Sequence, residues 1–269
     1  MADHLFFPRP IYLLGSNSYI AGQLRRHFEK HGHRVTGISH SIGFTGTFED
    51  GAAIVNCSAS YQPATDWDQM LKANYLFAKK MIERCNETNT VVNLASYFEI
   101  GEVSNPGPIN KYASAKLLLR AWLTDFARTK GIQVLNLMLY DVVGPDDHRR
   151  KLIPSILKLQ AGDEIELTGC EQIVNLTPVE NVVEAISQAL SDRTVSGLFS
   201  ASNTGFKPLK DYIHILQSII GFRPVFGAIP YGSEQIFQPL TNIPCISDSS
   251  SVEFNHNYVS SLRNGPELG

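Results

Sequence analysis

The chain has 269 residues, of which 43% are hydrophobic and 18% charged, enough for one large domain or for a core domain with a small lobe. Its 23 Lys and Arg stand against 26 Asp and Glu, without the basic excess of proteins that bind nucleic-acid phosphates. No stretch approaches the ~18 apolar residues of a membrane span, and the N-terminus does not resemble a signal peptide. We therefore expect a soluble, unprocessed protein without nucleic-acid or membrane partners.

The sequence gives no sign of disulfides or of a metal site. Its four cysteines are far apart and form no CxxC pair, which predicts reduced thiols and a cytoplasmic location: Cys57, Cys85, Cys170 and Cys245. His27, His31 and His33 have no neighbouring cysteine or carboxylate cluster to complete a metal shell. Trp67 and Trp122 are expected to be core residues.

In the first half of the chain, short apolar runs alternate with longer amphipathic stretches. The runs predict strands at 11–14, 34–38, 53–57, 90–94 and 133–138, and the stretches predict helices at 20–28, 67–85 and 111–130, the last ended by Gly131. This alternation is typical of a parallel sheet covered by helices on both faces. We predict an α/β fold with a Rossmann-type, doubly wound parallel sheet.

Beyond Gly144-Pro145 the alternation fades and prolines recur. Helices are predicted at 179–190 and 209–220, whereas the polar tail from residue 247 suggests loops. We expect a dinucleotide-binding domain over 1–165, to which some later segments return, and a small mixed substrate-binding lobe over 166–269.

The first predicted strand runs into a turn with small residues at Gly15, Ser18 and Ala21. A pyrophosphate at a helix N-terminus must approach backbone N–H groups closely, and bulky side chains would prevent this. The spacing is that of a G-x-x-G-x-x-G turn with Ser and Ala at the second and third positions. Small residues also occur in other strand-to-helix turns, so the motif alone leaves both interpretations open.

The second predicted strand ends without a carboxylate that could bind the adenosine ribose of NAD. Ser39, His40 and either Arg25 or Arg26 could instead contact a 2′-phosphate, which favours NADP(H) over NAD(H). The alternative is that His40 lies in a solvated loop and the arginines on a solvated helix face.

Tyr112 and Lys116 are four residues apart at the start of a predicted helix, on the same face. Reduction of a ketone by hydride requires a proton for the forming alkoxide, and a phenol gives it more readily when a fixed cation lowers its pKa. Ser96 ends an apolar strand, at the edge where α/β sheets bind ligands, and could hydrogen-bond a substrate carbonyl. These three are the candidate catalytic residues.

The order of the Gly15 turn, Ser96, Tyr112-x-x-x-Lys116 and Asp141-Val-Val-Gly-Pro145 resembles the extended short-chain dehydrogenase/reductases, which include nucleotide-sugar epimerases, dehydratases and 4-ketoreductases. The resemblance covers most of the chain and implies a nicotinamide cofactor and a nucleotide-diphosphate sugar substrate. The residues expected at the cofactor are Gly15, Ser18, Tyr19, Ile20, Ser39, His40, Cys57, Ser58, Ala59, Asn74, Tyr112, Lys116, Val142 and Val143.

Departures from the family pattern reduce the number of reactions that the chain is expected to catalyse. Where the family's dehydratases carry two carboxylates, this chain has Tyr97 and Phe98, and Glu99 follows one position late on a segment taken to be strand-like. Dehydration is therefore disfavoured. Val174 stands where an arginine often holds the diphosphate of the nucleotide. The run from Arg149 to Lys151 is interpreted as a solvated helix start, with contact to a substrate phosphate as the alternative.

Three functions remain. The first is an NADP(H)-dependent reductase of a nucleotide-linked 4-keto-6-deoxysugar, in deoxysugar and polysaccharide biosynthesis. The second is a nucleotide-sugar epimerase that retains NAD, and the third is a dinucleotide-sensing regulator without turnover. The resemblance also implies a homodimer formed through the helices within 66–85 and 111–130.

Overall fold

The computed structural model describes residues 9–41, 44–61, 66–192, 194–201, 205–246 and 252–264. The chain forms two compact units, each built from separate segments. The first comprises 1–95, 111–137 and 186–199, and the second 96–110, 138–185 and 200–269, as far as these ranges are described. Residue 165, where the sequence suggested a boundary, lies inside the second unit, and segment 186–199 returns to the first.

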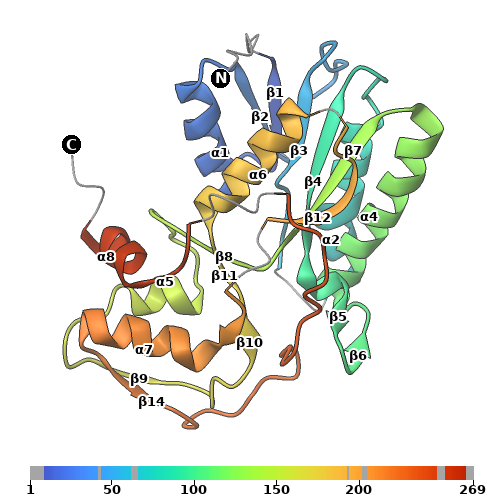
Figure 1. The fold of residues 1–269 in the computed structure, drawn as a ribbon. Helices are drawn as coiled ribbons and strands as arrows, with labels where there is room; N and C mark the ends of the chain where they lie inside the picture. The colour runs from blue at the N-terminus through green and yellow to red at the C-terminus, as the bar shows by residue number, and fades with distance from the viewer. Residues whose placement is uncertain are drawn as a thin grey trace. The chain divides into compact units, whose positions relative to one another are not determined.

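A six-stranded sheet in the order β12–β7–β4–β3–β1–β2 is the centre of the first unit (Figure 1). Its strands are β1 (Ile11–Leu14), β2 (Val35–Ile38), β3 (Ala53–Asn56), β4 (Thr90–Ser96), β7 (Gln133–Leu139) and β12 (Gly197–Ser200). Strand β1 pairs in parallel with β2 and β3, and β3 pairs in parallel with β4. The Rossmann-type fold and the five predicted strands are confirmed, with ends shifted by one or two residues.

Helices cover this sheet: α1 (Tyr19–Lys30), α2 (Trp67–Leu71), α3 (Phe77–Ile82), α4 (Lys111–Lys130) and α6 (Val179–Ser191). Helix α4 has the predicted bounds, and Gly131 follows it with a φ of +65°. The helix predicted for 67–85 is interrupted by a π-helical turn, η1 (Lys72–Leu76), and ends at Ile82. Helices α1 and α6 lie side by side, with His27 Nε2 3.2 Å from Ser187 Oγ.

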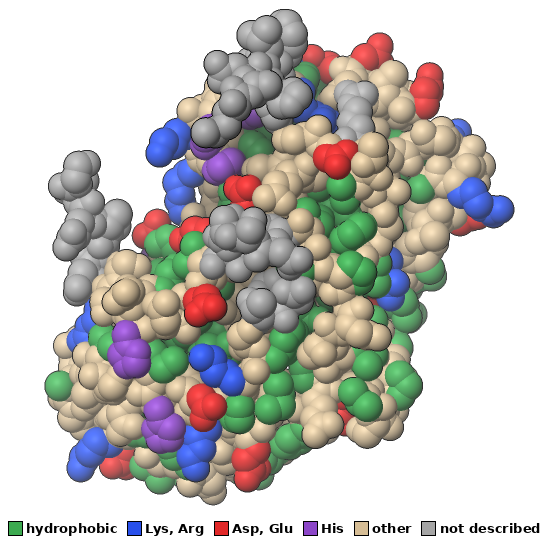
Figure 2. Space-filling model, in the orientation of Figure 1, with side chains coloured by type: hydrophobic (Ala, Val, Ile, Leu, Met, Phe, Trp, Pro, Cys, Tyr) green, Lys and Arg blue, Asp and Glu red, His purple; other side chains and the backbone are tan. Residues whose placement is uncertain are grey.

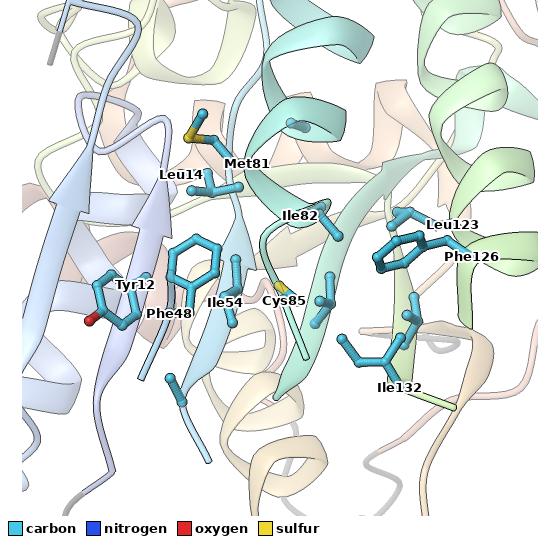
Figure 3. Close-up of a cluster of buried hydrophobic side chains, with 14 of the residues drawn as sticks. Tyr12, Leu14, Phe48, Ile54, Met81, Ile82, Cys85, Leu123, Phe126 and Ile132 are labelled. Carbon is cyan, nitrogen blue, oxygen red and sulfur yellow. The ribbon is translucent and has the colours of Figure 1, made fainter. Parts of the chain in front are cut away.

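One face of the sheet packs against α3 and α4 through a continuous apolar cluster (Figure 3). Every second strand residue contributes, because strand side chains alternate between the two faces. The strand members include Tyr12, Leu14, Ile54, Val91 and Val134. Trp122 packs against this cluster, but Trp67 is 39% exposed, so its prediction as a core residue is wrong. It is the first residue of α2, where only the next turn, at Met70, is buried.

The second unit combines short helices with two-stranded pairs. Its helices are α5 (Leu152–Ile156), α7 (Leu209–Ile220) and α8 (His256–Asn264). The pairs are β5 (Gly101–Glu102) with β6 (Asn105–Pro106), β8 (Asp141–Val143) with β11 (Leu176–Pro178), β9 (Glu164–Glu166) with β14 (Arg223–Val225), and β10 (Ile173–Val174) with β13 (Lys207–Pro208). A separate apolar cluster, which includes Tyr212 and Phe222, forms the core of this unit.

The prediction of loops for the tail is wrong in its later part, which forms α8. Phe254, Tyr258 and Val259 are buried in the core of the second unit, and Leu262 packs against it. The surrounding Ser and Asn residues made the segment look polar, whereas its few apolar residues fall on one helical face.

Surface charge, cysteines, potential metal ligands and helix hydropathy bear on the partners that the chain can bind. On the face drawn in Figure 2, basic and acidic side chains are interspersed. All four cysteines are free, and the described residues include no group of three or more potential metal ligands. Across the described segments, none of the helices has the length and hydropathy needed to cross a membrane.

Candidate functional site

The turn after β1 fits the close approach of a dinucleotide backbone. Gly15 has a φ of +73°, and a Cβ there would lie 2.5 Å from Ser58 Cα, so only glycine is accommodated. Ser18 caps α1, and its hydroxyl accepts a hydrogen bond from the N–H of Ala21 at 3.3 Å. Tyr19 and Ile20 open the helix at its positive end, which attracts phosphate.

At the end of β2, the groups suggested for a 2′-phosphate differ in their surroundings. The ring of His40 stacks on Phe77 at 4.0 Å, and partial burial lowers the pKa of His40. Ser39 is buried, with its hydroxyl 2.9 Å from that of Ser41. The side chain of Arg25 reaches the strand: a Cβ on Gly37 would lie 2.5 Å from Arg25 Nη2. Arg25 also pairs with Glu29 of the same helix, Nη1 lying 3.3 Å from Glu29 Oε1.

The segment after β3 forms the floor beneath the Gly15 turn. Ser58 is buried, and both its N–H and its hydroxyl donate to Asn56 Oδ1. Burial raises the pKa of the Cys57 thiol to about 12, against a smaller opposing effect of Lys116, so this cysteine is not a nucleophile at neutral pH. Ala59 follows, and its small side chain suits a surface against which a cofactor packs.

The π-helical turn η1 is hydrogen-bonded to the loop that follows β3, at Ser60. Asn74 is fully buried there; its Oδ1 accepts from the N–H of Ser60 at 2.8 Å, and its Nδ2 donates to the carbonyl of Ser60 at 2.9 Å. Tyr61, the residue after Ser60, has its ring centroid 5.3 Å from that of Tyr112. Asn74 therefore fixes a loop whose next side chain contacts the candidate proton donor.

Tyr112 and Lys116 occupy successive turns of α4, as their spacing predicted. Lys116 is 2% exposed, and its Nζ donates to the carbonyl of Leu94 at 2.5 Å. Since Leu94 lies in β4, this hydrogen bond fixes the ammonium at the sheet, near the strand's carboxyl end. Tyr112 is only half-buried. The pair thus combines an accessible phenol with a fixed cation.

Ser96 ends β4 and belongs to the second unit. Its N–H donates to Glu99 Oε1 at 2.7 Å, and its hydroxyl oxygen accepts from the N–H of Phe98 at 3.4 Å. Residues 97–99 form a 3₁₀ turn, so the expectation of a strand-like segment is wrong: the capping box of Ser96 and Glu99 favours a helical turn. Glu99 is buried, and its hydrogen bond to Ser96 gives it a structural role in this turn.

Strand β8 carries the other candidate cofactor residues of the second unit, Val142 and Val143. Tyr97 donates from its hydroxyl to Asp141 Oδ2 at 3.1 Å, and Val142 and Val143 follow Asp141 in the strand. The carbonyl of Val142 accepts from Arg149 Nη2 at 2.7 Å.

Arg149 also pairs with the buried Asp147, through Nε at 2.7 Å and Nη2 at 2.6 Å. The interpretation of 149–151 as a solvated helix start is therefore wrong for Arg149, since α5 begins only at Leu152. These bonds hold Nε and Nη2 against Asp147 and Val142, so the guanidinium is fixed beside β8.

Val174 lies in β10, directly opposite Lys207 of β13 in an antiparallel pair. Cross-strand partners present their side chains on the same face. The Lys207 ammonium lies over the ring of Tyr212, 4.6 Å from its centroid. Lys207 is thus the cationic residue directly across from Val174, the position for which the resemblance implies an arginine.

Each unit holds part of the predicted set. The first contains the glycine turn, the ends of β2 and β3, Asn74, Tyr112 and Lys116, and the second contains Ser96, Val142 and Val143. Sequence reasoning missed Tyr61, because only the folded path of its loop brings it to Tyr112. It also missed Asn93 and Asn136, although Asn stands fourth in each of three successive buried strands.

Comparison with known proteins agrees with this arrangement. Residues 11–198 match the model of the NAD-dependent epimerase/dehydratase family. The chain belongs to this family. Its members use a nicotinamide dinucleotide, for which the glycine turn and the positive end of α1 are suited.

One curated member of the epimerase/dehydratase family, CDP-abequose synthase of Yersinia pseudotuberculosis, is 30% identical over 103 residues. That match spans 37% of this chain and 36% of the relative, so it covers only about a third of either protein.

Solved structures show the same fold over nearly the whole chain. UDP-glucose 4-epimerase of Thermus thermophilus, in complex with NAD, has a TM-score of 0.74 at 13% identity, covering 96% of this chain and 99% of that one. RMD of Pseudomonas aeruginosa, complexed with NADPH, has a TM-score of 0.73 at 14% identity, covering 95% and 98%. At such identities the likeness concerns the fold alone.

Proposed function

We propose that this protein is an NADP(H)-dependent reductase of the keto group of a nucleotide-linked 4-keto-6-deoxysugar. The observation that carries the proposal is the pairing of a half-buried Tyr112 with a buried Lys116, fixed on Leu94, in a chain with a dinucleotide-binding turn.

Each candidate residue has a distinct role in this reaction. The bound nicotinamide supplies the hydride. Tyr112 gives its phenolic proton to the forming alkoxide, while the ammonium of Lys116 stabilises the phenolate left behind. One unit of pKa lowering corresponds to about 1.4 kcal/mol of such stabilisation. Ser96 donates a hydrogen bond to the carbonyl oxygen; its oxygen already accepts from Phe98, which leaves its proton as the donor.

Two observations favour reduction over dehydration. Tyr97 and Phe98 carry no carboxylate, and the carboxylate of Glu99 is hydrogen-bonded to the backbone of Ser96. Elimination of water needs an acid and a base near the sugar, and these three residues supply neither.

The choice of NADP(H) rests on the end of β2. No carboxylate is present there to bind a ribose 2′-hydroxyl, and a carboxylate would repel a 2′-phosphate. The guanidinium of Arg25, which lies over Gly37 and pairs with Glu29 at 3.3 Å, is the positive charge proposed to bind a 2′-phosphate.

The test is a screen of cofactor oxidation with 4-keto-6-deoxysugars on GDP, CDP, dTDP and UDP, with NADPH and NADH side by side. We expect stoichiometric NADPH oxidation with one nucleotide series. Sugar interconversion without net oxidation would replace the proposal with the epimerase. Cofactor binding without turnover of any keto-sugar would support the regulator instead.

A further inference from the structure

Three fully or nearly fully buried asparagines form a hydrogen-bonded ladder across the sheet of the first unit: Asn56, Asn93 and Asn136. Asn56 Nδ2 donates to Asn93 Oδ1 at 2.8 Å, and Asn93 Nδ2 donates to Asn136 Oδ1 at 2.9 Å. The ladder thus joins β3, β4 and β7 at one level.

The ladder faces α3 and α4. Strand side chains alternate, so Asn56, Asn93 and Asn136 share a face with Ile54, Val91 and Val134, two residues earlier in each strand. Those three belong to the apolar cluster with α3 and α4. Polar side chains therefore replace apolar ones at the next level towards the carboxyl ends of the strands.

The direction of the ladder is set at its β3 end. The N–H of Ser58 can only donate, and it donates to Asn56 Oδ1 at 3.2 Å. Asn56 must therefore turn its amide nitrogen towards β4. Each following asparagine then has only one orientation in which donors meet acceptors.

Ser58 connects the ladder to the nucleotide-binding turn. Its backbone is the closest neighbour of the site where a Cβ of Gly15 would lie, 2.5 Å from Ser58 Cα and 2.7 Å from Ser58 N. A displaced Ser58 would move into the turn or away from it, and backbone N–H groups that bind phosphate tolerate little displacement.

We infer that Asn93, through Asn56 and Ser58, is a positioning residue that sets the geometry of the Gly15 turn and with it the affinity for the nicotinamide dinucleotide. Buried amides stabilise a sheet core no better than apolar residues of similar shape, so stability alone does not account for three of them. The inference rests on the cofactor binding included in the proposed function.

The experiment measures the Kd of NADPH and of NADH, by the fluorescence of the reduced nicotinamide, together with the Tm of each variant without ligand. Asn93→Leu keeps the side-chain size but leaves Asn56 Nδ2 without its acceptor. We expect the Kd for the preferred cofactor to rise about tenfold, the effect of one unsatisfied buried group.

Asn89→Ala is the matched control. Asn89 is equally buried, donates to the carbonyl of Glu49 at 2.8 Å, and directly precedes β4, at the end remote from the ladder. It should lower the Tm and leave the Kd unchanged. Asn93→Leu also leaves Asn136 Oδ1 without its donor. If this variant does not fold, the double variant Asn93→Leu/Asn136→Leu removes that second unsatisfied group while Asn56 Nδ2 still lacks its acceptor, and it should retain both the fold and the raised Kd.

An unchanged Kd in a folded Asn93 variant, or an equal rise in Asn89→Ala, would overturn the inference. Because no sugar is used, the outcome is separate from the proposed reaction. Wild-type protein that binds cofactor but reduces no keto-sugar would refute only the proposed function, whereas wild-type protein that binds neither cofactor would refute both.

Discussion

The side chains around the end of β2 differ in their capacity to carry charge. His40 is stacked on Phe77, and the partial loss of hydration there lowers its pKa, which favours the neutral ring at pH 7 and above. Arg25 is the arginine whose side chain reaches this end of the strand, over Gly37. The preference for NADPH should therefore depend on Arg25 and not on His40.

We predict that Arg25→Gln lowers the ratio of kcat/KM for NADPH to that for NADH by about tenfold or more, the effect of one lost charge-assisted bond. His40→Gln should leave this ratio unchanged. Since His40 gains charge only as the pH falls below its lowered pKa, the wild-type ratio should stay constant from pH 7 to 9. A ratio that falls over this range, or that follows His40 and not Arg25, would contradict this assignment.

Lys207 offers a second residue-scale test, because it lies opposite Val174 in the β10–β13 pair. If its ammonium holds the substrate diphosphate, Lys207→Gln should raise KM for the nucleotide sugar about tenfold and leave the Kd of NADPH unchanged. Steady-state kinetics and cofactor titration separate the two effects. Lys158→Gln is a suitable control, since Lys158 lies outside this strand pair. An unchanged KM in the Lys207 variant would exclude this role.

At the scale of elements, the regular parts of the fold could be predicted because each has a clear period. The five strands and helices α4 and α7 follow from apolar runs and helical spacing. The π turn η1 could not be predicted, because its residues keep a helical pattern. A π turn contains one residue more than an α-helical turn, and here the hydrogen bonds of Asn74 to Ser60, distant in the sequence, accompany it. Helix α8 was missed for a similar reason: its burial depends on the core of the second unit.

The π turn has a testable consequence, because Asn74 holds Ser60 and Tyr61 contacts the ring of Tyr112. Asn74→Leu leaves the N–H and carbonyl of Ser60 without these partners. We expect kcat to fall at least tenfold as Tyr112 loses its support.

Two variants of Tyr61 test the same support without disturbing the π turn. Tyr61→Ala should lower kcat in the same direction as Asn74→Leu, and Tyr61→Phe, which retains the ring, should restore it. Pre-steady-state and steady-state kinetics measure both. Equal loss in the Ala and Phe variants would show that the ring contact is not what supports Tyr112.

At the scale of the whole molecule, the spacing of Tyr112 and Lys116 was evident from the sequence because one helix carries both. The contacts that hold the site residues in place were not evident from the sequence. The position of Arg25 over Gly37 depends on how separate segments meet, and no local pattern encodes it. For the asparagine ladder, the repeated Asn in fourth place of three strands was a signal, but only the strand order brings those residues together.

The exposed leucines of the helices in the first unit make the predicted homodimer testable. Leu76 and Leu118 are 47% and 42% exposed, in η1 and in α4. If these helices form the interface, Leu118→Glu should place a charge in it and shift the mass measured by light scattering from dimer to monomer. The control is Ile229→Glu, at a position of the second unit that is also 42% exposed, which should leave the mass unchanged. A dimeric Leu118→Glu protein would exclude this interface.

The most direct measurement is the single-turnover rate of Tyr112→Phe with saturating NADPH and the reactive keto-sugar nucleotide. This substitution removes the phenolic proton and leaves Lys116 and the glycine turn in place. The account predicts a rate about 10³-fold below that of the wild type, with the Kd of NADPH unchanged. A Tyr112→Phe protein that turns over at the wild-type rate would contradict it.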